Sequence, residues 1–99
     1  RETVRDYLLE HLAEPLTIDQ IARETGGSVS AIQRHFKEHF GVTVFEFLRA
    51  RRLEKARDAL ERTGATIAQA AYIAGYANPS NFTTAFKKAY GIAPKYHRC

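Results

Sequence analysis

Apolar residues recur every three or four positions along most of the chain, a spacing typical of amphipathic helices. The first predicted helix carries its apolar side chains on one face, at Val4, Tyr7, Leu8 and Leu12. Pro15 follows shortly afterwards, as expected beyond a helix end. Taken along the whole chain, the pattern predicts an all-α protein of about seven helices. The last of these is a short helix that begins at Pro94 and holds Tyr96.

A second helix is predicted to begin at Thr17, because Thr17-Ile-Asp-Gln20 has the form of a capping box. In such a box the Thr17 hydroxyl accepts from the backbone amide of Gln20, and the Gln20 side chain reaches back to the amide of Thr17. The helix ends at Gly26-Gly27. Its inward positions are Ile18, Ile21 and Ala22.

Two further helices follow in the same manner. Ser28 can cap a third helix that ends near Gly41, and Thr43-Val-Phe-Glu46 is a capping box for a long helix that runs to about Thr63. The third helix has an apolar stripe that we expect to be buried: Val29, Ile32, Phe36 and Phe40. The expected buried positions of the long helix are Phe47, Leu48, Leu53, Ala56 and Leu60.

The pattern then occurs a second time. Thr66-Ile-Ala-Gln69 repeats Thr17-Ile-Asp-Gln20 at an offset of 49 residues, and Gly75 takes the place of Gly26. Beyond Gly75 the second copy contains one extra residue, so the offset becomes 50. The matched pairs are then Ser80 with Ser30, Phe86 with Phe36, Lys87 with Lys37, Tyr90 with Phe40 and Gly91 with Gly41. Asn78-Pro79 provides a cap and a first-turn proline for the second copy of the longer helix.

Each copy consists of a short helix, a glycine-containing turn and a longer helix, which is the order of a helix-turn-helix unit. The second helix of such a unit enters the major groove of DNA. A helical-hairpin repeat that binds protein is the alternative, but solenoid arrays need about three copies to bury a core. We therefore predict one DNA-binding domain over 1–99, with helix-turn-helix units at about 17–40 and 66–90 joined by a linker helix at about 43–63.

The face of the third helix opposite its apolar stripe suits the reading of bases. It carries Ser30, Gln33 and Arg34, and Lys37 lies one turn further on, where a phosphate contact is expected. Gln can bond adenine through two atoms, and Arg can do the same with guanine. We therefore expect the first unit to supply most of the base discrimination.

The matching face of the second unit carries Ser80, Thr83, Thr84 and Lys87. A threonine can touch a thymine methyl or donate one hydrogen bond, but it cannot make the bidentate pairs that arginine makes. From this unit we expect contacts to phosphate, shape readout and contacts to thymine methyls.

Further phosphate contacts are predicted at helix starts and on the linker. Free amides at a helix start favour an anion, and four residues stand at such starts, where capping alone is an equally good interpretation: Thr17, Ser28, Thr66 and Asn78. Arg49 and Arg52 can meet the DNA backbone between two grooves. A helix of about 20 residues spans about 30 Å, close to the ~34 Å turn of B-DNA. One chain could therefore read two adjacent major grooves without dimerising.

Composition is compatible with this interpretation. Fifteen Lys and Arg against 11 Asp and Glu give a net charge of +4, a modest basic excess. The single cysteine, Cys99, is the last residue, so neither an internal disulfide nor a cysteine metal site is expected. No apolar run approaches the ~20 residues of a membrane span and no signal-like segment opens the chain, so we expect a cytoplasmic protein with no membrane contact. Since the chain opens with Arg1 rather than Met, we expect it to be part of a longer protein.

The histidines indicate neither a metal site nor an enzyme. His35 and His39 are four residues apart on a predicted helix, but no cysteine partner lies near them in the sequence. No nucleophile–base arrangement and no phosphate-cradling glycine loop is present. We expect no catalytic residue, no metal and no cofactor.

The second half of the chain carries a set of motifs in a fixed order. They are Ile67-Ala68-Gln69-Ala70-Ala71, Gly75-Tyr76, Phe82, Phe86-Lys87-Lys88, Gly91-Ile92-Ala93-Pro94 and Tyr96. With the basic stretch Leu48-Arg49-Ala50-Arg51-Arg52-Leu53, they resemble the DNA-binding domain of AraC/XylS-type bacterial transcription regulators. The resemblance covers nearly the whole chain, as far as Arg98.

The resemblance implies sequence-specific binding of double-stranded DNA within a transcription regulator, usually an activator. It points to Ser30, Gln33 and Arg34 as base-reading residues of the first unit, and to Pro79, Ser80, Thr83 and Thr84 in the second. Family members often have Arg where Thr84 stands. RNA polymerase is an expected partner, a separate sensor domain would hold any effector, and the isolated domain is expected to be monomeric. The alternative function is a helical protein-interaction module with non-specific affinity for DNA.

Overall fold

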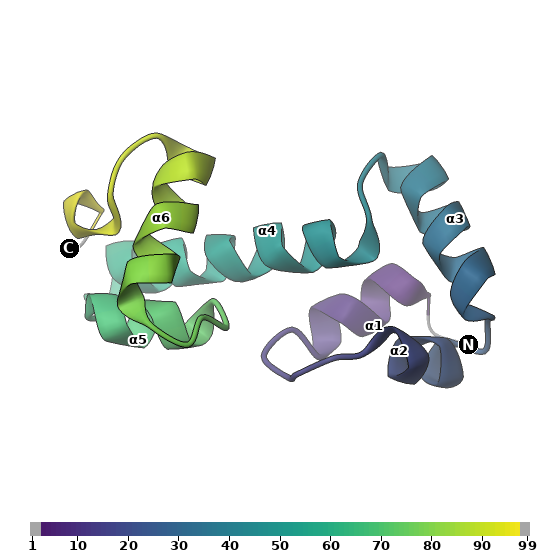
Figure 1. The fold of residues 1–99 in the computed structure, drawn as a ribbon. Coiled ribbons are helices and arrows are strands. Elements are labelled where there is room, and N and C mark those ends of the chain that lie inside the picture. The colour runs from purple at the N-terminus through teal and green to yellow at the C-terminus, as the bar shows by residue number, and fades with distance from the viewer. Residues whose placement is uncertain (1–2, 98–99) are drawn as a thin grey trace. The chain divides into compact units, whose positions relative to one another are not determined.

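The computed structural model describes residues 3–97, and within them the chain is all-helical, which confirms the predicted fold class (Figure 1). The α-helices are α1 (Val4–Glu10), α2 (Ile18–Thr25), α3 (Val29–Phe40), α4 (Val44–Asp58), α5 (Ile67–Ile73) and α6 (Pro79–Tyr90). A π-helical turn, η1 (Ala59–Thr63), continues α4, and a 3-10 turn, η2 (Pro94–Tyr96), stands where a last short helix is predicted. No helix in this part of the chain has the length and apolar character of a membrane span. The predictions for Arg1 and Cys99 lie outside the described residues.

The chain forms two compact units, and the boundary between them falls within α4. Unit 1 comprises residues 1–51 and unit 2 comprises residues 52–99. Unit 1 therefore holds α1, α2, α3 and the first part of α4, and unit 2 holds the rest of α4 with η1, α5, α6 and η2. Each helix pair of the repeat belongs to its own unit.

Unit 1 is built around side chains from all four of its helices. The buried apolar residues are Tyr7, Leu8, Ile21, Ala22, Ile32, Phe36, Val44 and Leu48. All of them except Val44 are expected from the helical pattern. The predicted burial of Phe40 is wrong: its side chain is 37% exposed, although its ring lies 4.5 Å from that of Phe36. Phe40 is the last residue of α3, so no further turn of that helix covers its outer edge.

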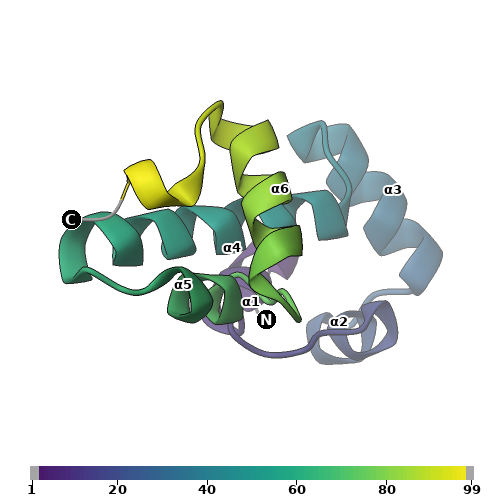
Figure 2. The same ribbon diagram turned by 60° about the vertical axis from the view of Figure 1, so that its left-hand side comes forward.

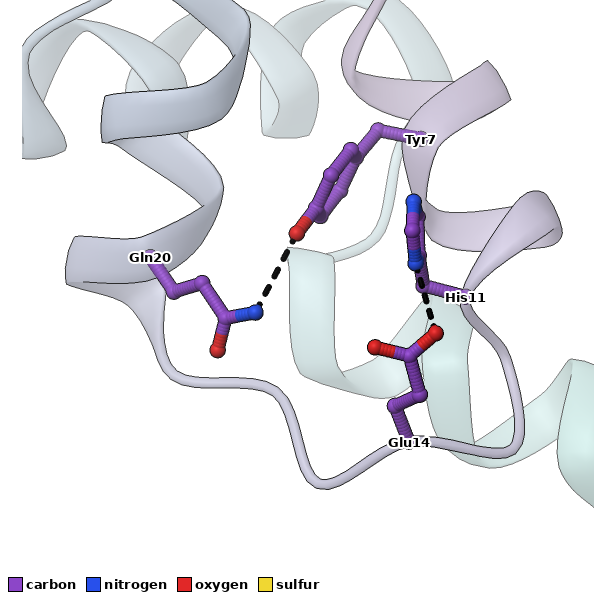
Figure 3. Close-up of polar contacts among 4 residues, drawn as sticks. All are labelled: Tyr7, His11, Glu14 and Gln20. Atoms are coloured by element: carbon purple, nitrogen blue, oxygen red, sulfur yellow. Dashed lines mark hydrogen bonds and ion pairs between the residues drawn. The ribbon is translucent and has the colours of Figure 1, made fainter.

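Tyr7 also changes the start of α2 (Figure 3). The Thr17 hydroxyl accepts from the amide of Gln20 at 3.1 Å, as predicted. The Gln20 side chain does not reach back, however: its Nε2 donates to the Tyr7 hydroxyl at 3.3 Å. The ring of Tyr7 packs against His11, whose Nδ1 lies 2.7 Å from a carboxylate oxygen of Glu14. The first box is therefore only half formed, because the Gln20 side chain turns toward Tyr7 instead of back to the amide of Thr17.

Unit 2 has a core rich in alanine and phenylalanine. Its fully buried members are Leu53, Ala56, Leu60, Ala70, Ala71, Ala74, Phe82 and Phe86. After α6 the chain returns beside α6 toward η1, as Figure 2 shows. There His97 lies edge-on to Phe86 at 5.0 Å, and its Nδ1 lies 2.7 Å from a carboxylate oxygen of Glu61. This contact ties the segment after η2 to the end of the linker helix.

The change in the repeat offset from 49 to 50 residues arises between the two helices of each unit. Both second helices have 12 residues, at an offset of 50, whereas α2 has eight residues and α5 has seven. Gly26 and Gly75 have φ values of 80° and 82°, a left-handed conformation that glycine adopts without a steric cost. The turn in unit 2 contains two more residues than the turn in unit 1. The two copies thus share the length of their second helix and differ most in the turn before it.

Candidate nucleic-acid interface

The predicted reading face of α3 is exposed along its length. Ile32 and Phe36 are buried in the unit 1 core. Ser30, Gln33, Arg34 and Lys37 are all exposed, at the spacing that places side chains on one side of a helix. The Arg34 guanidinium lies 3.5 Å from the ring of its neighbour His35, which leaves most of its donors available. This face can therefore present an amide and a guanidinium together.

The corresponding face of α6 is less uniform. Phe82 and Phe86 are fully buried, and Ser80, Thr84 and Lys87 are exposed, but Thr83 is only partly exposed. The Thr84 hydroxyl donates to the backbone carbonyl of Ser80 at 3.1 Å. With its proton used within the helix, Thr84 offers an acceptor and a methyl group, which fits a thymine contact better than a hydrogen bond to a base acceptor.

Two exposed residues on α6 are missing from the sequence-based prediction. Asn81 and Lys88 are both exposed on this helix. At the offset of 50 they correspond to Ala31 and Glu38 of α3. The signal was therefore available in the repeat, since at these positions the second copy has an amide and a basic side chain where the first copy has an alanine and a glutamate.

The four predicted helix-start residues all act as caps. Their side chains accept from backbone amides three residues later at 2.9–3.2 Å, in Thr17, Ser28, Thr66 and Asn78. At Thr66 the box is complete, because its own amide donates to Gln69 Oε1 at 2.8 Å. Capping uses only an acceptor, so the hydroxyl protons and the amide group of Asn78 remain able to donate.

The two linker arginines differ in their surroundings. Arg49 is exposed, whereas Arg52 is half-buried and lies beside the turn of unit 2. A methyl group placed on Gly75 would stand 3.8 Å from both Cδ and Nη1 of Arg52. Arg51, between them, holds its guanidinium 5.3 Å from the centre of the Phe47 ring. Of the two predicted phosphate contacts on the linker, Arg49 is thus the more accessible to solvent.

Charge is divided unequally between the units. Unit 2 has eight lysines and arginines against three carboxylates, a net +5, while unit 1 has seven against eight, a net −1. The basic excess of the chain therefore belongs to the second unit. A positive surface attracts phosphates regardless of base sequence. Unit 1 instead presents the hydrogen-bonding side chains Gln33 and Arg34 on α3.

At the start of α4 one carboxylate is held in its charged form. Glu46 accepts from the backbone amide of Thr43 at 2.8 Å, and its own amide donates to the Thr43 hydroxyl at 3.1 Å. The bond from the Thr43 backbone, followed by that from the side chain and by the charges of Lys37 and Arg49, holds the pKa of Glu46 below its ordinary value. This is the complete capping box predicted there.

The histidines of the described residues form no cluster for a metal ion. No group of three or more metal-binding side chains occurs between residues 3 and 97. His35 and His39 are exposed on α3 and line a shallow groove beside α1 with a volume of about 560 Å³. His11 and His97 are each paired with a glutamate instead. The arrangement suits structural roles for these two pairs.

Two helix-turn-helix units, each with an exposed polar face on its second helix, define a class of nucleic-acid-binding domain. Residues 21–98 match a family model described as a helix-turn-helix domain. The chain is 35% identical to the xylose operon regulatory protein of Escherichia coli (strain K12), over 93% of the chain and 24% of that protein. It is 37% identical to the transposon Tn10 TetD protein of Escherichia coli, over 96% of the chain and 71% of that protein.

Solved structures show the same relationship. A transcriptional regulator from Chromobacterium violaceum, described as having an AraC-type DNA-binding domain, superposes with a TM-score of 0.89. It is 26% identical, with 96% of this chain and 85% of that one covered. The chain belongs to the family of AraC-type helix-turn-helix domains, as the motif resemblance implied. It spans about a quarter of the length of the xylose operon regulatory protein.

Proposed function

We propose that this chain is the part of a bacterial transcription regulator that binds double-stranded DNA, with α3 and α6 in two adjacent major grooves. The observation that carries the proposal is the repeat of one arrangement: two 12-residue helices, each with buried apolar residues on one side and exposed polar residues on the other. A protein-docking helix pair has no need of two such faces. The names of the relatives, among them a xylose operon regulatory protein, agree with a regulatory role.

Base reading is assigned to the second helix of each unit. The residues are Ser30, Gln33 and Arg34 on α3, and Pro79, Ser80, Thr83 and Thr84 on α6. The exposed amide and guanidinium of α3 support a larger share of discrimination for unit 1. The partial burial of Thr83 and the internal hydrogen bond of Thr84 support a smaller share for these two threonines.

Phosphate contacts are assigned to the flanks of these faces. Lys37, Lys87 and Arg49 are exposed cations that suit this role, and Arg52 at the turn of unit 2 is placed with them. The capping residues would add contacts through donors that capping leaves unused: Thr17, Ser28, Thr66 and Asn78. These contacts would fix the register of the domain on the duplex without reading its sequence.

We propose a general role for the whole regulator. An activator that contacts RNA polymerase and works in the bacterial cytoplasm is the function that the family favours. Effector binding is not assigned to this chain, and we propose that the domain binds DNA as a monomer. Equilibrium sedimentation of the domain at micromolar concentration tests the last point, because a dimer there would contradict it.

The deciding experiment is selection from a randomised duplex pool at two salt concentrations, followed by sequencing. We expect enrichment of a bipartite site whose two short motifs lie about one helical turn apart. Arg34→Ala should relax selection in one motif, while Arg23→Ala, the loss of an exposed arginine from α2, should leave both motifs unchanged. Salt-sensitive binding without enrichment would contradict sequence-specific reading. Absence of binding at both salt concentrations would favour the protein-interaction module.

A further inference from the structure

Asn81 occupies the third position of α6, in the first turn of the helix. Its backbone amide donates to the Asn78 side chain at 2.9 Å, which fixes the helix start. Its own side chain is exposed and makes no hydrogen bond with another described residue. It is also the only carboxamide in this helix. An amide is thus held on a rigid element with both its donor and its acceptor directed to solvent.

Helix geometry places this amide beside Thr84 on the exposed side of α6. Successive residues are rotated by about 100° around a helix axis, so residues three and four apart share a side. Asn81 lies three residues before Thr84, which is exposed, and the inward direction is fixed by the fully buried Phe82 and Phe86. The N-terminal residues of a recognition helix are also those that contact base edges. Asn81 therefore stands where a base reader is needed.

The other residues on this face have less to offer a base. The proton of the Thr84 hydroxyl is donated to Ser80, Thr83 is partly buried, and Ser80 has a single hydroxyl. An asparagine, in contrast, can accept from the adenine N6 amino group while it donates to N7, a pair of bonds that no other base offers in the major groove. In unit 1 the equivalent residue is Ala31, so a carboxamide at this position of the helix occurs in unit 2 alone.

We propose that Asn81 is the main specificity-determining residue of unit 2 and that it reads one adenine in the groove that α6 enters. The assignment rests on the proposed function, because it requires α6 to lie in a major groove. It changes the proposed division of base reading between the units. Unit 2 makes one bidentate base contact in addition to its contacts with phosphates and thymine methyls. The threonines then have secondary roles around that contact.

The test compares the wild-type domain with Asn81→Ala and Asn81→Asp in the same duplex selection. For Asn81→Ala we expect the preference for adenine at one position to fall about tenfold, the order of magnitude of a lost bidentate contact. For Asn81→Asp we expect the preference to move to cytosine, whose N4 amino group donates to a carboxylate. Selection at the motif that unit 1 reads should stay unchanged in both variants. If Asn81 had a purely structural role, Asn81→Asp would not shift the preferred base from adenine to cytosine.

A modified duplex gives a second and independent readout. Replacing the selected adenine by 7-deazaadenine removes N7 as an acceptor. This change should weaken DNA binding by the wild-type domain but not by Asn81→Ala. Lys88→Ala, the loss of another exposed side chain from the same helix, is the control, and it should keep the adenine preference. Retention of that preference by Asn81→Ala, or its loss in Lys88→Ala, would overturn the assignment. If the wild-type protein selects no second motif at all, the two-groove function fails, and the role of Asn81 fails with it.

Discussion

Gly27 and Ile32 lie in close contact at the turn between α2 and α3. A methyl group on Gly27 would stand 2.9 Å from Cγ1 and 3.0 Å from Cδ1 of Ile32. Ile32 is 7% exposed and belongs to the unit 1 core. The backbone of Gly27 is not left-handed, so its special role is steric. The absence of a side chain at residue 27 lets the recognition helix pack closely against the turn.

We therefore expect Gly27→Ala to destabilise the domain. Moving Ile32 within a packed core should cost about 1–3 kcal/mol. That outweighs the ~0.4–1 kcal/mol that a glycine-to-alanine change contributes through the unfolded chain where the backbone permits it. Urea denaturation measures the free energy of unfolding. An unchanged or increased value would show that Ile32 yields without cost and that the close contact does not constrain the turn.

At the scale of elements, three similar sequence patterns produce two complete capping boxes and one half-formed box. The boxes at Thr43 and Thr66 close fully, whereas at Thr17 the second bond is absent because Gln20 donates to Tyr7. The closed boxes could be predicted, since all their partners lie within four residues. The contact from Tyr7 could not, because it joins residues 13 apart and depends on how α1 packs.

The difference between local and tertiary contacts also explains where the other sequence-based predictions agree with the structure and where they do not. The helices and the buried faces of Ile32, Phe36, Phe82 and Phe86 follow from local periodicity. The exposure of Phe40 depends on whether another element covers the end of α3, which no local pattern contains. Asn81 could have been found from the sequence by asking where the two copies differ as well as where they agree.

The box at Thr43 should make the stability of α4 depend on pH. The pKa of Glu46 is lower in the folded domain than its ordinary value, so the folded state favours the carboxylate. The resulting stabilisation is present in full above the ordinary pKa of glutamate and is lost as the pH falls through the lowered value. Glu46→Gln should keep both hydrogen bonds, as Gln69 does at Thr66, but remove this part of the acid dependence.

Urea denaturation between about pH 7 and pH 3 compares the two proteins. We expect the free energy of unfolding to fall less steeply with decreasing pH in Glu46→Gln than in the wild type. Gln69→Glu, which places a carboxylate in the second box, is the reciprocal variant and should steepen the fall. Parallel curves for wild type and Glu46→Gln would mean that the bonds from Thr43 do not favour the carboxylate in solution.

At the scale of the whole molecule, we expect attraction to phosphates and discrimination between bases to be divided between the two units. Unit 1 is nearly neutral and presents Gln33 and Arg34, while unit 2 carries a net +5 and presents exposed lysines on α6. Cations that neutralise phosphates release counterions, so their contribution weakens as salt is raised. The salt dependence of binding should therefore depend mainly on unit 2.

Lys87→Ala tests this division. Loss of one phosphate contact should lower the slope of log K against log salt by about 0.9 and weaken binding to all sequences about equally. Lys95→Ala is a matched control, because it removes the same charge from η2 instead of α6; there the ammonium lies over the Tyr96 ring at 5.1 Å. Fluorescence anisotropy titrations of selected and scrambled duplexes over a range of salt give both quantities. An equal loss of slope in both variants would mean that unit 2 acts through its overall charge, whereas a loss confined to Lys87→Ala would place a phosphate beside α6 itself.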